Sequence, residues 1–139
     1  MTVPGLKTIT KSVVGELANG LGIGPFACRG KVLILAYHRV VTPDDLSRGH
    51  IEPGMYVLRD VFDMQVRWLV ERFEILSFTQ LLARWNDNEW DKRKRYCVLT
   101  FDDGWLDNYH HAFPILKTYQ VPATIFLPTN YIGSDEWFW

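Results

Sequence analysis

Two kinds of hydrophobic pattern alternate along most of this chain. Continuous apolar runs at residues 32–37, 96–101 and 123–127 are typical of strands that are buried on both faces. Between them, apolar positions recur at helical spacing, from about residue 61 to 72 and from about 106 to 119. Because strands alternate with helices, the pattern predicts an α/β fold with a parallel sheet.

The segments between these runs carry the residues that begin and end helices. We expect Asp60 to cap the first long helix, and Thr79 to open a shorter one after a short strand at residues 75–76. Residues 38–58 contain two prolines and two glycines, which predicts a long loop of the kind that is often functional. Pro114 is expected to kink the last helix or to start its second part.

The N-terminal segment has a weaker pattern of its own. Ile9, Val13 and Leu17 recur every four residues, which predicts a short helix with one apolar face over residues 8–19. A run rich in glycine at residues 20–25 then ends the helix. We therefore expect residues 1–29 to form a helical appendage, which packs on the domain or contacts a partner.

Composition narrows the class of protein. A chain of 139 residues suits one domain, and a net charge of −1 gives no reason to expect nucleic acid as a partner. Lys7, Lys11 and Glu16 interrupt the N-terminus, and no stretch approaches the ~20 apolar residues of a membrane span, so a cytoplasmic location is the default expectation. Cys28 and Cys97, the two cysteines, do not make a disulfide framework.

The residues with the clearest chemistry come directly after the apolar run at residues 96–101. That run stops abruptly at Asp102, Asp103 and Gly104, and ligands collect where parallel strands end. Two adjacent carboxylates repel each other unless a cation or a proton relieves the charge. This arrangement suggests one carboxylate on a metal ion and the other acting as a base. The alternative is an acidic turn that caps the following helix.

The run from Thr100 to Gly104, Thr-Phe-Asp-Asp-Gly, resembles the first motif of the polysaccharide deacetylases, carbohydrate esterase family four. The resemblance extends to the Tyr37-His38 strand end and to residues 112–117 and 121–127. It implies that residues 30–139 are the N-terminal part of a distorted (β/α) barrel of the glycoside hydrolase/deacetylase type. The implied activity is metal-dependent hydrolysis of N-acetyl groups on a polysaccharide or oligosaccharide.

The same resemblance assigns roles to single residues. It makes Asp102 the general base and Asp103 a ligand of a divalent metal ion, most simply zinc. His38 follows the opening strand and should lie at the same rim, where it lines the substrate pocket or orients a carboxylate, or is instead a hydrogen-bonded structural histidine. Of the remaining histidines, His110 and His111 point about 100° apart on a helix, so they are poorly placed to share one ion.

Part of the family pattern is not in this sequence. The family's second motif, His-x-x-x-His, supplies the two other metal ligands, and it is absent here. We therefore expect a truncated and inactive N-terminal portion that would pair with a complementing C-terminal portion. The alternatives are a non-catalytic remnant or a partner- or sugar-binding fragment, and a phosphoacceptor receiver domain. The receiver domain needs an aspartate where residues 123–127 are followed instead by Pro128.

Overall fold

The computed structural model of the chain describes residues 29–136, so the helix expected at residues 8–19 lies outside the described residues. In the described part no helix is long and apolar enough to cross a bilayer. The strands and helices follow one another in this order: β1 (Val32–Tyr37), β2 (Arg39–Val41), α3 (Pro43–Arg48), β3 (Tyr56–Leu58), α4 (Arg59–Val70), β4 (Glu74–Ile75), α5 (Phe78–Asn86), β5 (Tyr96–Asp102), the π-helical turn η1 (Asn108–Ala112), α6 (Phe113–Thr118), β6 (Ala123–Phe126) and the short 3-10 turn η2 (Thr129–Tyr131).

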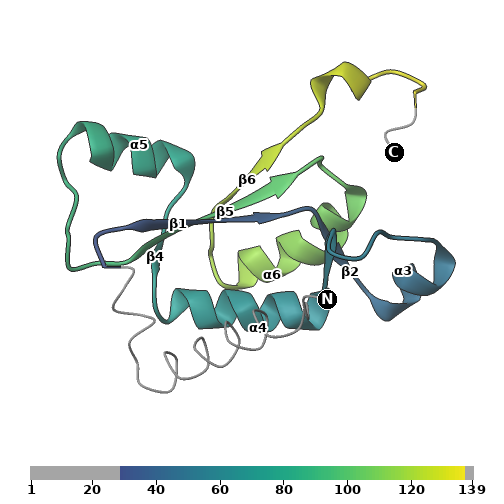
Figure 1. Cartoon of the computed structure of the whole chain (residues 1–139), viewed down its shortest axis with the longest axis horizontal. Helices are drawn as coiled ribbons and strands as arrows, with labels where there is room; N and C mark the ends of the chain where they lie inside the picture. The colour runs from purple at the N-terminus through teal and green to yellow at the C-terminus, as the bar shows by residue number, and fades with distance from the viewer. Residues whose placement is uncertain (1–28, 137–139) are drawn as a thin grey trace, which may run out of the picture.

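The main sheet is parallel and is built around β5 (Figure 1). β1 pairs with β5 along its whole length, from Val32 opposite Tyr96 to Tyr37 opposite Phe101. β4 pairs with the first residues of β5 and β6 with the last ones. Among the described strands, β1 and β6 each have one neighbour. The predicted parallel α/β sheet is therefore confirmed.

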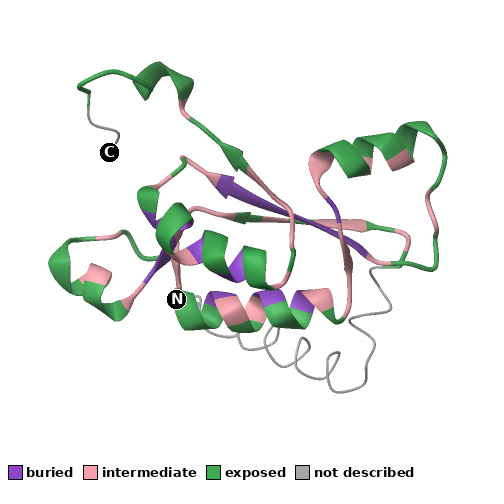
Figure 2. Cartoon of the chain, turned by 180° about the vertical axis from the view of Figure 1, so that it is seen from behind, coloured by how far each residue is buried: buried purple, intermediate pink, exposed green. Residues whose placement is uncertain are grey.

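Helices cover the two faces of the sheet unequally. α4 and α6 lie together on one side, and α5 lies on the other (Figures 1 and 2). Because side chains alternate along a strand, Cys97, Leu99 and Phe101 of β5 face α4 and α6, where they form the larger part of the core. Tyr96 and Val98 face the opposite way and join a smaller cluster with residues of α5. β5 is thus buried on both faces.

Aromatic rings fill the end of the core that lies nearest the acid pair. The ring of Phe62 in α4 meets Tyr37 edge-on at 5.1 Å and Phe101 at 5.8 Å between ring centroids. Tyr37 and Phe101 stack on each other at 5.5 Å. Burial raises the pKa of Tyr37 to about 12 and that of the Cys97 thiol to about 11, so both stay protonated near neutral pH. Cys97 is a free, buried thiol.

The prediction of a long loop at residues 38–58 is wrong. The segment contains β2 and β3, which pair in parallel, and the helix α3 between them. Thr42 and Asp45 form a reciprocal cap: the Thr42 hydroxyl accepts from the Asp45 N–H, and the Asp45 carboxylate accepts from the Thr42 N–H at 2.7 Å. Pro43 stands in the first turn of α3, where its missing N–H costs nothing.

Several expected boundaries also shift. α4 begins at Arg59, so Asp60 lies inside its first turn and does not cap it. Ser77, rather than Thr79, caps α5, because its hydroxyl accepts from the Gln80 N–H while the Gln80 side chain accepts from the Ser77 N–H. α6 is a second helical part that begins at Phe113 after the wider turn of η1, and Pro114 stands in its first turn.

An ion-pair cluster on the surface predicts how stability depends on pH. The Glu74 carboxylate pairs with Arg84, and its Oε2 accepts from Lys94 Nζ at 2.9 Å. The hydrogen bond from Arg84, and then the one from Lys94, hold the pKa of Glu74 below its ordinary value.

A carboxylate whose pKa is lower in the folded than in the unfolded state stabilises the fold above the unfolded pKa. This stabilisation is lost as the pH falls through the folded-state pKa. We expect the free energy of unfolding to decline below about pH 4.5, and to decline less steeply in Glu74→Gln. Urea unfolding from pH 7 to pH 3 measures this, and identical slopes in the two proteins would contradict it.

Candidate active site

The register of the sheet gathers three predicted residues at one rim. Asp102 is the last residue of β5, and His38 follows the last residue of β1, which lies opposite Phe101. Asp103 follows directly on Asp102. The carboxyl ends of parallel strands meet at one edge of a sheet, which is where α/β proteins bind ligands and carry out chemistry. The structure therefore places His38, Asp102 and Asp103 on the rim at which such sites form.

The backbone turns sharply after Asp102. Asp103 has a φ of 73° and Gly104 a φ of 66°, so two successive residues are in the left-handed region. Aspartate adopts this region more readily than most residues, but at some cost in energy. A Cβ on Gly104 would also meet Cδ2 of Leu127, the end of a half-exposed side chain that would have to turn aside. The turn directs the two neighbouring carboxylates into different surroundings.

The side chain of Asp102 lies beside His38 in a partly open position. Nε2 of His38 is 3.9 Å from Oδ2 of Asp102, and the two side chains are 31% and 36% exposed. That separation is too long for a hydrogen bond but close enough for electrostatic attraction when the imidazole is protonated. Asp102 is thus a carboxylate accessible to water and next to an ionisable partner.

Asp103 has the opposite environment. Its Oδ2 atom is buried and has no hydrogen-bond partner among the described residues. Burying a carboxylate oxygen without a partner costs free energy. The oxygen is therefore suited to bind a cation, or to accept a hydrogen bond from a group outside the described part. The described residues contain no set of three His, Cys, Asp or Glu side chains placed to hold a metal ion. Asp103 therefore fits one ligand position, and the described residues do not complete a site.

A second ion pair holds β2 against the start of the helical segment after the turn. Oδ2 of Asp107 accepts from Arg39 Nε at 2.8 Å, and its Oδ1 accepts from the Val40 N–H at 3.1 Å. The guanidinium of Arg39 also lies 4.3 Å from the ring centroid of Trp105. Since Arg39 follows His38, these contacts fix the segment that presents His38 to Asp102. Sequence reasoning missed Arg39, Trp105 and Asp107, because nothing in the sequence indicates a pair 68 residues apart.

The other histidines lie away from the acid pair. His111 Nε2 is 3.2 Å from Oδ2 of Asp45, which ties η1 to α3. Hydrogen bonds from Thr42, with a smaller contribution from His111, hold the pKa of Asp45 below its ordinary value. His110 makes ring contacts with Tyr109, and His50 lies on the surface beside Glu52.

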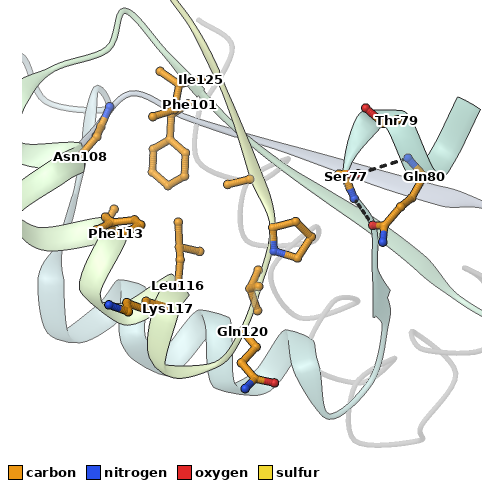
Figure 3. Close-up of a pocket in the computed structure, with 14 residues that line it drawn as sticks. Ser77, Thr79, Gln80, Phe101, Asn108, Phe113, Leu116, Lys117, Gln120 and Ile125 are labelled. Carbon is orange, nitrogen blue, oxygen red and sulfur yellow. Dashed lines mark hydrogen bonds between the residues drawn. The ribbon is translucent and has the colours of Figure 1, made fainter.

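A cavity of about 890 Å³ lies between α6 and the strands β5 and β6. Phe101, Leu116 and Ile125 line it, and the acid pair does not (Figure 3). Asn108 also lines the cavity, and both polar atoms of its side chain are buried without a partner in the described part. The cavity is mostly apolar and does not contain the acid pair, so we look for the chemistry at the rim.

Comparison with known proteins identifies the family of the chain. The sequence profile described as polysaccharide deacetylase matches residues 89–137, a range that contains the acid pair. This chain belongs to the polysaccharide deacetylase family. The poly-β-1,6-N-acetyl-D-glucosamine N-deacetylase of Staphylococcus epidermidis is 34% identical in an alignment of 116 positions that covers 78% of this chain and 39% of that relative. The chain thus spans about two fifths of that relative's length.

Solved structures of deacetylases have the same fold. The deacetylase PplD of Streptococcus pyogenes, solved with acetate, aligns with a TM-score of 0.57 and 30% identity over 77% of this chain and 47% of PplD. The de-N-acetylase of Aggregatibacter actinomycetemcomitans aligns with a TM-score of 0.57 and 26% identity, over 68% of this chain and 36% of the enzyme. The parallel α/β architecture is accordingly consistent with part of the distorted barrel of polysaccharide deacetylases.

The turn at Gly104 can be tested by a double-mutant cycle. Gly104→Ala should lower the free energy of unfolding by about 1–2 kcal/mol, because the left-handed strain is joined by the cost of turning the Leu127 side chain aside. In a Leu127→Ala background the collision is gone, so the same substitution should cost only the strain of about 1 kcal/mol. Urea unfolding of the four proteins gives the coupling energy. A cost that is equal in the two backgrounds would rule out the contact.

Proposed function

We propose that this chain carries the general base and one metal ligand of a deacetylase that hydrolyses N-acetyl groups on a polysaccharide or oligosaccharide. The observation that carries the proposal is the strained turn at the rim, which separates an open carboxylate, Asp102, from one with a buried, unpartnered oxygen, Asp103. The proposal is further supported by family membership and by relatives that are N-deacetylases.

Each carboxylate has a role that its surroundings favour. Asp102, open to water, is the general base and accepts the proton of the attacking water molecule. Asp103 is one ligand of a divalent metal ion, with zinc the first candidate. Such an ion, when bound, polarises the acetamide carbonyl and makes water a better nucleophile. His38 either orients Asp102 or contacts the sugar, and the ion pair of Arg39 with Asp107 holds it in place.

The remaining ligands must come from elsewhere. We propose that residues 30–139 are the N-terminal portion of the catalytic domain and residues 1–29 an appendage to it. The other metal ligands and the general acid would then belong to a complementing C-terminal portion. The described sheet has room for this portion, since β6 pairs only with β5 among the described strands and Ile125, Phe126 and Leu127 are about half exposed.

A second function is favoured by the incomplete donor set. A chain that holds one carboxylate ligand and no group of three donors in its described part could bind an N-acetylated sugar or a partner without turnover. This reading predicts sugar binding that does not depend on metal. Titrating the chain with N-acetylglucosamine oligomers, with and without a chelator, separates the two functions.

The activity of the chain by itself is the first test. The purified 139-residue chain should release no acetate above background from N-acetylglucosamine oligomers, with or without Zn²⁺. The reason is that an unactivated amide needs the metal ion, and a missing general acid alone commonly costs ~10²–10⁴-fold. Zn²⁺-dependent release that Asp102→Asn abolishes would show that the chain has a complete ligand set after all.

The two aspartates should differ in a chain extended to the length of the relatives. There, Asp102→Asn should lower kcat by ~10²–10⁴-fold and leave the bound metal in place, because it removes a base and not a ligand. Asp103→Asn should lower both metal content and kcat. Metal analysis beside acetate release distinguishes the roles. Loss of metal in Asp102→Asn, with metal retained in Asp103→Asn, would reverse the assignment.

A further inference from the structure

A basic face lies at the end of the sheet opposite the acid pair. It consists of residues 29–31, 71–74 and 90–95, which lead into β1, β4 and β5. The first residues of β1 and β4 both stand opposite Tyr96, so these segments meet at one edge of the parallel sheet. That edge is about 20 Å from Asp102, the length of β5. The face contains no residue of the acid pair, so it is independent of the proposed function.

The basic face carries a charge that the chain as a whole lacks. It contains seven of the 15 Lys and Arg residues and three of the 16 Asp and Glu residues, which gives it a net charge of +4. Because the whole chain carries −1, the remainder of the chain carries −5. A charge separation of this size orients a protein in the field of a charged partner.

The fold holds the basic segments together. The Gly30 N–H donates to the Lys94 carbonyl at 2.8 Å, and the Trp90 indole N–H donates to the Gly30 carbonyl at 2.9 Å. Gly30 has a φ of 66° and lies so close to Lys92 that an added Cβ would be 3.1 Å from the Lys92 backbone. The turn that carries Lys31 is thus fixed against the segment of Lys92 and Lys94. Repulsion between basic residues on neighbouring segments costs free energy, which a bound anion removes.

Acidic side chains neutralise only part of the basic face. Three ion pairs lie within it: Lys94 with Glu74, Arg93 with Asp91 and Arg72 with Glu71. Among the described residues, the side chains of Lys31, Lys92 and Arg95 have no ion-pair or hydrogen-bond partner. Arg95 also lines a groove of about 340 Å³ between residues 70–74 and 93–95. A guanidinium in this position is suited to bind a phosphate group, because two of its N–H groups can donate to one phosphate.

Exposed tryptophans flank the basic face. Trp85, near the end of α5, is 69% exposed, and its ring centroid is 6.1 Å from that of Trp90. Trp68 of α4 is 44% exposed, and the Arg72 guanidinium lies 4.8 Å from its ring centroid. α4 and α5 lie on opposite sides of the sheet (Figure 1). Tryptophan beside Lys and Arg is typical of surfaces that lie at the membrane–water interface, where the ring enters the headgroup layer. A free phosphate ion would leave both tryptophans in water, so lipid headgroups account for more of this face.

We propose that the basic face binds a surface of anionic phospholipids. The headgroup phosphates contact Arg95 and its basic neighbours, and Trp85 lies at the level of the headgroups. The remainder of the chain, with its charge of −5, is repelled by the same surface, so one orientation is favoured. In that orientation the acid pair lies about 20 Å from the basic face, on the side that remains open to a polymer chain.

Vesicle flotation with the 139-residue chain tests the partner. Vesicles with about 30% phosphatidylserine in phosphatidylcholine should carry the chain upward, and pure phosphatidylcholine vesicles should not. Binding should weaken steeply as the salt concentration rises to about 0.5 M, because salt screens the attraction. Equal flotation with the two kinds of vesicle, or no flotation with either, would overturn the proposal.

Charge-removing substitutions test the face. Lys92→Gln and Arg95→Gln should each lower the partition coefficient about fivefold, and together about 25-fold, since each basic residue near an anionic surface contributes about that factor. Arg48→Gln removes the same charge from α3, where the side chain is 75% exposed, and is the matched control. It should leave binding unchanged within about twofold. Equal losses in Arg95→Gln and Arg48→Gln would show that net charge alone matters, which would overturn the assignment to this face.

A soluble anion and a tryptophan substitution distinguish lipid from free phosphate. Trp85→Ser should lower vesicle binding and leave the thermal midpoint of the chain unchanged, because this side chain is largely exposed. Tripolyphosphate should bind weakly and should not saturate the chain at millimolar concentration. Saturable binding of tripolyphosphate that Arg95→Gln abolishes, together with vesicle binding that Trp85→Ser leaves intact, would assign the groove to soluble phosphate and overturn the proposal.

Discussion

The burial of β5 is the constraint on which the rest of the structure depends. Five consecutive residues, Tyr96 to Thr100, are almost inaccessible to water, and β1, β4 and β6 all pair with this strand. A strand buried on both faces has all its backbone groups satisfied by its neighbours and tolerates little displacement. Its last residue is Asp102. Because Asp102 ends this strand, the close packing of the core also fixes the position of its backbone at the rim.

The sequence predicted those parts of the fold that continuous patterns determine. Long apolar runs locate β1, β5 and β6, and the abrupt end of β5 locates Asp102 and Asp103 at the rim. The elements within residues 38–58 could not be read in this way. Their strands are three residues long, and Pro43 and Gly49 are as common in loops as at helix ends. The choice between Ser77 and Thr79 as a cap likewise depends on a hydrogen bond and not on composition.

The supporting contacts of the site were less predictable than its acids. The pairing of Arg39 with Asp107 exists because the register of β1 and β5 brings the segments that follow them together. The unpartnered oxygen of Asp103 depends on the left-handed turn, which a sequence containing Asp-Asp-Gly permits but does not require. Residue types alone thus indicated where chemistry collects, and the three-dimensional structure was needed to distinguish an open carboxylate from one with a buried, unpartnered oxygen.

The single carboxylate of Asp107 has a dynamic consequence. Its two oxygens bind different parts of the chain, one the Arg39 side chain and the other the Val40 backbone. Movement of β2 away from the start of η1 must therefore break both bonds at once and leave the nearly buried Asp107 carboxylate without a partner. Local fluctuations of β2 and of the start of η1 should then be correlated, and slow amide exchange should extend from β5 to the Val40 N–H. His38 directly precedes Arg39, so the same carboxylate should also restrain the segment that holds His38 at the rim.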